Sequence, residues 1–254
     1  MNDEESLKQQ MKYGIEVARP KKVVFCIPAY PFRPHQATID SLRDSVPAIE
    51  AAGWLHGFVP EIGNPYISAA RATMLYKALK ADATDVVFID QDVSWRPQDM
   101  VKLLSTKGDV VSGTYRFKTA EESYMCNIHS DPNTNTPIVR ASDGAVKATR
   151  VPGGFLRVTR AAVNHFMEKY PDLCYGEYCD PYVDLFNHGA HKRLWYGEDF
   201  AFSRNWIDAG GELWIVPDLN INHHKGDEVF AGNFHEYLLR QPGGSKDPNR
   251  SGDD

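Results

Sequence analysis

Residues 84–95 read TDVVFIDQDVSW, and this stretch decides what kind of fold the chain can form. Its apolar run, residues 86–89, is made of strand-favouring residues, and such a run is typical of a strand buried on both faces of a sheet. The run leads directly into Asp90, Gln91 and Asp92. Because open α/β sheets bind ligands at the carboxyl ends of their strands, the sequence predicts a ligand site here.

Asp90 and Asp92 are separated by one residue, so in an extended segment their side chains point to the same side. Such a pair can present oxygen atoms to one hard divalent cation, which a diphosphate can share. The pattern also fits the first motif of haloacid-dehalogenase-like phosphatases, with Asp90 as nucleophile and Asp92 as acid and base. A third interpretation is a solvated turn, so the rest of the chain has to decide.

The composition is that of a globular, enzyme-sized protein. With 254 residues, 42% of them hydrophobic, the chain can bury one substantial core. No apolar run approaches the roughly 20 residues of a membrane helix, and the polar amino terminus is unlike a signal peptide. We therefore expect a cytoplasmic protein without a membrane partner. A net charge of −6 argues against non-specific attraction of the whole surface to nucleic acid.

Strand and helix patterns alternate along the chain. Strand patterns occur at residues 22–30, 54–59, 109–114, 151–158, 213–216 and 220–224, and helical spacing occurs at 38–52 (with Thr38 as N-cap), 67–80, 98–104, 160–169 and 200–209. Residues 171–193 are expected to form a mobile loop over a site. We predict one α/β domain over residues 20–240, with a mixed, mostly parallel sheet flanked by helices. An amino-terminal lead-in (1–19) precedes it, and a disordered tail (241–254) follows.

Other residue types suited to chemistry stand outside the central stretch. Arg71 lies near a predicted helix start, where it can meet phosphate oxygens or pair with an acid on the surface. Gly153 and Gly154 allow close backbone approach to a ligand, or merely form a bulge. Glu198 and Asp199 precede a helix, where a carboxylate can be an N-cap or a general base.

A histidine pair ends the strand predicted at residues 220–224. One imidazole there can complete a coordination shell begun by Asp92, with diphosphate and water in the other positions, although a single histidine is more often structural. Alternation along the strand places His223 and His224 on opposite faces. The sequence leaves open which of them faces Asp92.

In their order along the chain, these motifs resemble the GT-A glycosyltransferase superfamily, particularly small, soluble, bacteriophage-type members close to family 2. The resemblance covers residues 22–226 and rests on seven segments: VVFCIPAY, ISAARATMLYKAL, FIDQDV, GDVVSGTYR, VPGGFLRVTR, YGEDFAFSRNWIDAGGELWIVPD and NINHHKG. It implies a Rossmann-like GT-A domain acting in the cytoplasm, which is the host cytoplasm if a phage encodes the chain.

The resemblance also implies roles for individual residues. The donor would be bound by Pro28, Ala29, Tyr30, Arg71, Asp90, Gln91, Gly153 and Gly154. Asp92 would be the more direct metal ligand, joined by Asp90 and His223. Asp199 matches the acceptor-activating base of inverting members, and Glu198 matches a residue that orients donor or acceptor hydroxyl groups.

The implied reaction is displacement at the anomeric carbon of a nucleotide-sugar, a UDP-sugar by resemblance. Asp199 takes the acceptor proton while Mn²⁺ or Mg²⁺ stabilises the leaving diphosphate. If Asp199 only holds a hydroxyl group, a retaining outcome stays open. Two other classes also stay open: the phosphatase, although no later apolar strand ends in paired aspartates, and a catalytically silent binding module.

The acceptor is left open between two kinds of molecule. Phage-type relatives suggest a hydroxymethylated base in DNA, which would make this a DNA-modification enzyme, or else a glycan or small molecule. Basic residues are concentrated in segments expected to border the acceptor, where they can contact phosphates or simply be solvated: Arg116, Lys118, Lys147, Arg150, Arg157, Arg160, His191, Lys192, Arg193 and Lys225.

Overall fold

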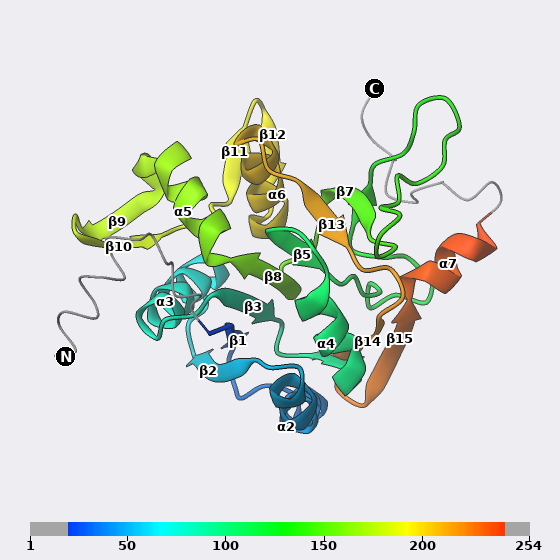
Figure 1. The fold of residues 1–254 in the computed structure, drawn as a ribbon, viewed down its shortest axis with the longest axis horizontal. Helices are drawn as coiled ribbons and strands as arrows, with labels where there is room; N and C mark the ends of the chain where they lie inside the picture. Colours follow the sequence, from blue (N-terminus) through cyan, green and yellow to red (C-terminus); the bar gives the residue numbers. More distant parts are fainter. Residues whose placement is uncertain (1–19, 242–254) are drawn as a thin grey trace, which may run out of the picture.

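A computed structural model of the protein describes residues 20–241. They form an α/β structure around one eight-stranded sheet with the strand order β2-β1-β3-β8-β5-β13-β7-β6. In Figure 1 this order runs from β2 at the lower left to β7 at the upper right. The lead-in predicted at 1–19 and the tail predicted beyond residue 241 lie outside the described residues.

The strands are short, and the stretch that decides the fold supplies two of them, β3 and β4. The strands of the large sheet are β1 (Lys22–Ala29), β2 (Leu55–Ile62), β3 (Asp85–Ile89), β5 (Val110–Ser112), β6 (Asn127–Ile128), β7 (Val146–Arg150), β8 (Phe155–Thr159) and β13 (Leu213–Ile215). A separate three-stranded sheet contains β4 (Val93–Trp95), β14 (Asn220–Lys225) and β15 (Glu228–Asn233). Two hairpins consist of β9 (Cys174–Glu177) with β10 (Asp180–Val183), and β11 (Gly189–His191) with β12 (Leu194–Tyr196).

The helices are α2 (Gln36–Ala51), α3 (Ile67–Lys80), α4 (Pro97–Ser105), α5 (Arg160–Lys169), α6 (Glu198–Asp208) and α7 (Phe234–Arg240), with a 3₁₀ turn, η1, at Pro171–Leu173. The bounds of α3 and α5 are those predicted from sequence. The predicted N-cap of α2 is wrong: His35 caps the helix, and Thr38 is buried within it, where its hydroxyl donates to the Gln91 carbonyl oxygen at 2.9 Å. Residues 171–193, predicted as a mobile loop, contain η1, the β9–β10 hairpin and β11, which pairs with β12 just beyond this range.

The predicted mixed, mostly parallel α/β fold is confirmed: six of the eight strands of the large sheet run in the same direction, and β8 and β7 run opposite to them. Within the large sheet β1 pairs in parallel with β2 and β3, and β5 with β13. The other four neighbouring pairs are antiparallel, because β8 enters between β3 and β5 in the opposite direction and β7 and β6 add to the far edge. Apolar runs alone do not reveal which strands run opposite to the others.

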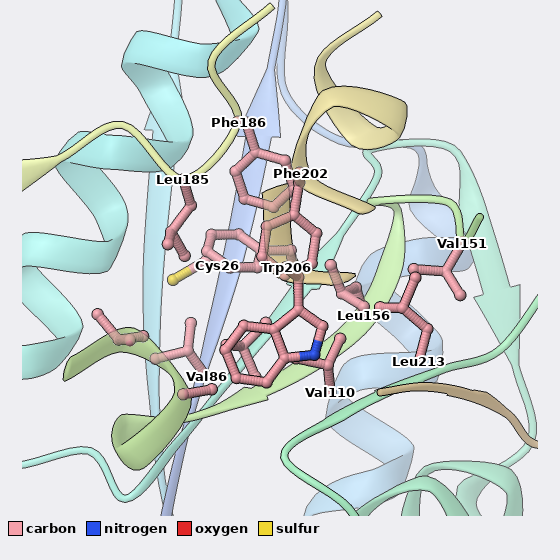
Figure 2. Packing of buried hydrophobic residues seen from close by; sticks show 14 of the residues in the cluster. Cys26, Val86, Val110, Val151, Leu156, Leu185, Phe186, Phe202, Trp206 and Leu213 are labelled. Carbon is pink, nitrogen blue, oxygen red and sulfur yellow. The ribbon is translucent and has the colours of Figure 1, made fainter. Parts of the chain in front are cut away.

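Side chains of β1 alternate between the two faces of the sheet, and each face has its own apolar core. Val24 and Cys26 belong to the core shared with α3, α5 and α6, whereas Val23 and Phe25 belong to the core shared with α2 and α4. Figure 2 shows the first of these cores, in which Cys26, Phe186, Phe202 and Trp206 lie together. Within residues 20–241, no helix has the length and apolarity needed to span a bilayer.

Candidate active site

A cleft of about 380 Å³ lies where β1 and β3 end. Its position at the carboxyl ends of two parallel strands is the one expected for an open α/β sheet. It brings together residues from β1 and the loop after it, the β2–α3 loop, α3, the segments that follow β3 and β5, α6 and β14. These residues are Pro28, Ala29, Tyr30, Asn64, Pro65, Ile67, Arg71, Asp90, Gln91, Asp92, Lys118, Glu198 and His223.

Asp92 and His223 meet because β14 pairs antiparallel with β4. The register places His223 opposite Val93, and the His224 amide donates to the Asp92 carbonyl oxygen at 2.8 Å. The His223 side chain then faces the Asp92 carboxylate, with Nε2 at 3.4 Å from Oδ1. His224 points elsewhere: its ring stacks on His35 with 4.4 Å between centroids, and its Nε2 lies 2.8 Å from the Ser94 hydroxyl.

The other nitrogen of His223 is fixed by the main chain. Nδ1 lies 2.8 Å from the Arg116 carbonyl oxygen, which can only accept, so Nδ1 carries a hydrogen. Nε2 is left facing Asp92, where it can bind a proton or a metal ion. Lys118 contacts the second carboxylate oxygen of Asp92. Burial opposes ionisation of Asp92, but hydrogen bonds from His223 and Lys118 outweigh it and lower the pKa of this carboxyl group.

Asp90 is held by different partners. Its Oδ1 accepts from Arg71 Nη2 at 3.0 Å, and its Oδ2 accepts from the Tyr115 hydroxyl at 2.7 Å. Arg71 also lies 3.4 Å from a Glu198 oxygen, and its guanidinium packs 4.6 Å from the Phe186 ring centroid. The Arg71 side chain is only 2% exposed, so it orients the two carboxylates from within the protein.

Gly153 and Gly154 form the wall behind these residues. A Cβ on Gly153 would lie 2.6 Å from Arg71 Nη1, and one on Gly154 would lie 2.1 Å from both Asp90 Oδ2 and the Tyr115 hydroxyl oxygen. The Asp90 amide donates to the Gly154 carbonyl oxygen at 2.9 Å. The glycines therefore make room for the site and do not line the cleft themselves.

Gln91 connects the end of β3 to the loop that follows β1. Its side-chain amide donates to the Tyr30 carbonyl oxygen at 3.0 Å and accepts from the Tyr30 amide at 3.1 Å. The main-chain carbonyl oxygen of Gln91 accepts from the main-chain amide of His35 at 2.7 Å. Gln91 thus holds Tyr30, which is 54% exposed, at the mouth of the cleft.

Asp199 lies beside the cleft, in the first turn of α6, and is not among its lining residues. One of its oxygens accepts from the Phe200 amide at 2.8 Å, which leaves the other free to accept a proton. Burial, followed by repulsion from Glu198, raises the pKa of Asp199 to about 6. At neutral pH Asp199 is therefore an ionised carboxylate and a stronger base than an ordinary aspartate.

The donor set fits a divalent cation only in part. Asp92 and His223 face each other with an oxygen and a nitrogen suited to Mn²⁺ or Mg²⁺, and the second nitrogen of His223 is anchored as in metal-binding histidines. Asp90 does not join them, because both of its oxygens are engaged by Arg71 and Tyr115. Across residues 20–241, no group of three or more His, Cys, Asp or Glu residues is arranged to hold a metal ion.

Two residues that contact the aspartates, Tyr115 and Lys118, are not predicted from the sequence as site residues. Tyr115 is buried, and burial together with the Asp90 charge raises its pKa well above the usual range, so the phenol stays protonated and donates. Lys118 was noted only as one of several basic residues. The available signal was the segment GTYRFK, residues 113–118, which directly follows the short strand β5. β3 and β5 both pair antiparallel with β8, so their carboxyl ends lie at the same edge of the sheet, where Tyr115 meets Asp90 and Lys118 meets Asp92.

The basic residues expected near an acceptor do not form one exposed face. The Arg157 guanidinium is buried and donates to the carbonyl oxygens of Leu103, Leu104 and Gly108. Arg160 donates to two other carbonyl oxygens, and Lys147 pairs with Glu212. Lys192 and Arg193 are exposed at the turn between β11 and β12. The expectation that Arg157 contacts the acceptor is therefore wrong. Acceptor contact by Lys192 and Arg193 stays a prediction.

No known protein-family profile matches the sequence, and no curated protein is similar to it in sequence. Solved structures with a similar fold include A197 from STIV, with 16% identity, 84% of this chain and 94% of that chain covered, and a TM-score of 0.47. GalNAc-T7 with UDP, GalNAc and Mn²⁺ has 12% identity, with 82% and 44% covered and a TM-score of 0.48. The catalytic domain of Drosophila β1,4-galactosyltransferase 7 with xylobiose has 12% identity, with 87% and 74% covered and a TM-score of 0.41. Similarity at this low sequence identity concerns the fold alone and does not show to which family this chain belongs.

Proposed function

We propose that this protein is a glycosyltransferase that moves a sugar from a nucleotide-sugar, a UDP-sugar, to an acceptor hydroxyl group. The observation that carries the proposal is the convergence of Asp92, His223, Lys118 and the Arg71–Asp90 pair on one cleft at the carboxyl ends of β1 and β3. A nucleotide diphosphate-sugar needs this combination: a cation site for the diphosphate and fixed carboxylates for hydroxyl groups.

The residues that line the cleft suit the different parts of such a donor. Pro28, Ala29 and the exposed Tyr30 supply an apolar and aromatic surface for a base and ribose. Each carboxylate oxygen can accept a second hydrogen bond, so Asp90 and Glu198, both oriented by Arg71, can still accept from ribose or sugar hydroxyl groups. Asp92 and His223 would hold a Mn²⁺ or Mg²⁺ ion between them and the diphosphate.

In the proposed reaction the acceptor oxygen forms a bond to the anomeric carbon while the bond from that carbon to the diphosphate oxygen breaks. The acceptor proton moves to the free oxygen of Asp199, whose raised pKa makes it suited to accept a proton near neutral pH. The Phe200 amide keeps the other Asp199 oxygen in place. A bound divalent cation supplies Lewis-acid stabilisation of the diphosphate charge. Inversion at the anomeric carbon follows if Asp199 acts directly as the base.

A hydrolysis screen tests the donor. The protein is incubated with Mn²⁺ or Mg²⁺ and a panel of nucleotide-sugars, and release of the nucleoside diphosphate is measured. We expect turnover of a UDP-sugar that Asp92→Ala abolishes while the fold is kept. Asp218→Ala is the matched control, since Asp218 is a surface carboxylate paired with Lys102. Full activity of Asp92→Ala would contradict the proposal.

The phosphatase interpretation is disfavoured by the surroundings of Asp90. A nucleophilic aspartate has to bring one oxygen into line with a phosphorus atom, but both Asp90 oxygens are fixed by buried side chains, Arg71 and Tyr115, and would have to give up one of these hydrogen bonds. Phosphatase activity that vanadate or beryllofluoride inhibits, together with an absence of UDP binding, would support the phosphatase interpretation. Binding of nucleotide-sugars with neither transfer nor slow hydrolysis would instead indicate a silent binding module.

For the acceptor we propose hydroxymethylated DNA, with a glycan or small molecule as the alternative. The supporting observation is the exposed β11–β12 hairpin, which carries Lys192 and Arg193 at its turn and the 73%-exposed Trp195 shortly before Glu198. A basic turn can contact phosphates and an exposed indole can stack on a base. We expect salt-sensitive DNA binding that Lys192→Glu with Arg193→Glu weakens. Unchanged binding, or transfer only to glycans, would exclude DNA.

A further inference from the structure

Lys118 places a positive charge on the carboxylate that the proposed function assigns to a metal ion. Its ammonium group contacts Asp92 Oδ2, while Asp92 Oδ1 faces His223. The Lys118 and Asp92 side chains are 28% and 26% exposed, so water screens this pair less than a surface pair. Both oxygens of Asp92 are therefore engaged from within the protein.

The position of Lys118 is set by the same segment that orients the ligands. Tyr115 donates to Asp90, and the Arg116 carbonyl oxygen accepts from His223 Nδ1 at 2.8 Å. The Phe117 amide donates to the Ser123 carbonyl oxygen at 3.0 Å and closes the loop base. Lys118 follows directly, so its backbone is anchored next to Asp92 while its side chain can rotate away.

An ammonium group on Asp92 Oδ2 and a divalent cation between Asp92 Oδ1 and His223 would place two positive charges on one carboxylate, so each weakens the binding of the other. We propose that Lys118 is an internal competitor of the metal ion: it neutralises Asp92 when no metal is bound and has to leave Asp92 when a metal ion binds. This inference rests on the proposed function only in assigning Asp92 and His223 as the metal ligands.

The competition links metal binding to donor binding. When a cation displaces Lys118, the ammonium group loses its partner within the cleft. A diphosphate bound in the same cleft brings oxygens with which the displaced ammonium can pair. Metal and nucleotide diphosphate therefore bind cooperatively, and by reciprocity each raises the affinity of the protein for the other.

The test measures Mn²⁺ binding by electron paramagnetic resonance of the free ion, with and without UDP, on the full chain. Lys118→Met is expected to bind Mn²⁺ about tenfold more tightly than the wild type without UDP, and to gain less affinity when UDP is added. Lys118→Arg keeps the charge and should resemble the wild type. Lys147→Met is the matched control, because Lys147 is similarly exposed but pairs with Glu212 away from the cleft.

Unchanged or weaker Mn²⁺ binding by Lys118→Met would overturn the proposal, as would an undiminished effect of UDP. A misfolded variant is recognised by its circular dichroism, and Lys118→Gln then provides the neutral side chain. If no variant binds Mn²⁺ but nucleotide-sugar turnover persists, the competition is refuted and the proposed function stands. If Lys118→Met binds Mn²⁺ tightly but the wild type turns over no nucleotide-sugar, the proposed function fails and the competition stands.

Discussion

Gly154→Ala should damage the site without introducing any charged or large group. A Cβ at this position would lie 2.1 Å from Asp90 Oδ2 and 2.1 Å from the Tyr115 hydroxyl oxygen. Real Cβ atoms almost never lie closer than 3.0 Å to such an atom. Neither neighbour can move freely, because Tyr115 is buried and Asp90 is bound to Arg71 at 3.0 Å. The substitution must therefore break the 2.7 Å hydrogen bond between Tyr115 and Asp90.

A hydrogen bond to a charged group contributes about 1.5–3 kcal/mol, so the expected loss in UDP-sugar affinity is about tenfold to hundredfold. Isothermal titration calorimetry with UDP and the UDP-sugar measures this loss, and thermal unfolding separates it from a loss of fold. Gly57→Ala is the control, since its Cβ would meet only Val24 Cγ2 at an ordinary 3.5 Å. Wild-type affinity in Gly154→Ala would refute the role assigned to the Asp90–Tyr115 pair.

Three further predictions concern the base, the phenol and a buried arginine. Because Asp199 must be ionised to accept a proton and its pKa is raised to about 6, kcat/KM should fall as pH decreases through about 6, and Asp199→Asn should remove this dependence along with most activity. Tyr115→Phe should weaken UDP-sugar binding about tenfold while the fold is kept, as calorimetry would show; an unaffected affinity would contradict its contact with Asp90. Arg157→Leu leaves three carbonyl groups and Asp85 without their buried partner, so we expect the free energy of unfolding to fall by about 3 kcal/mol. Urea unfolding measures this loss. Donor binding should change little at temperatures where the variant is folded.

The sequence was most informative where local chemistry decides the structure. The helix Ile67–Lys80 and the helix Arg160–Lys169 have the predicted bounds because their apolar spacing and flanking residues specify them locally. The buried run before Asp90 was likewise predicted as a strand with a ligand site at its end. The mixed α/β class followed from the alternation of such elements.

Strand direction and contacts distant in sequence were beyond this reasoning. An apolar run does not indicate the direction of its strand, so the sequence could not predict that β8 lies antiparallel between β3 and β5. The sequence does not reveal the strands β9, β10 and β11 within the loop predicted at residues 171–193, because they are short and lack a periodic apolar pattern.

By itself the sequence determined that two aspartates would stand at the end of a buried strand, with Gly, Glu, Asp and His residues available to a site there. Only the tertiary structure decided which of these residues contacts Asp90 and which contacts Asp92. The register between β14 and β4 turns His223 and not His224 to Asp92, and the segment after β5 places Tyr115 on Asp90 and Lys118 on Asp92. The physical reason is that side-chain partners depend on which strands are neighbours and in what register, and these are properties of the folded sheet as a whole.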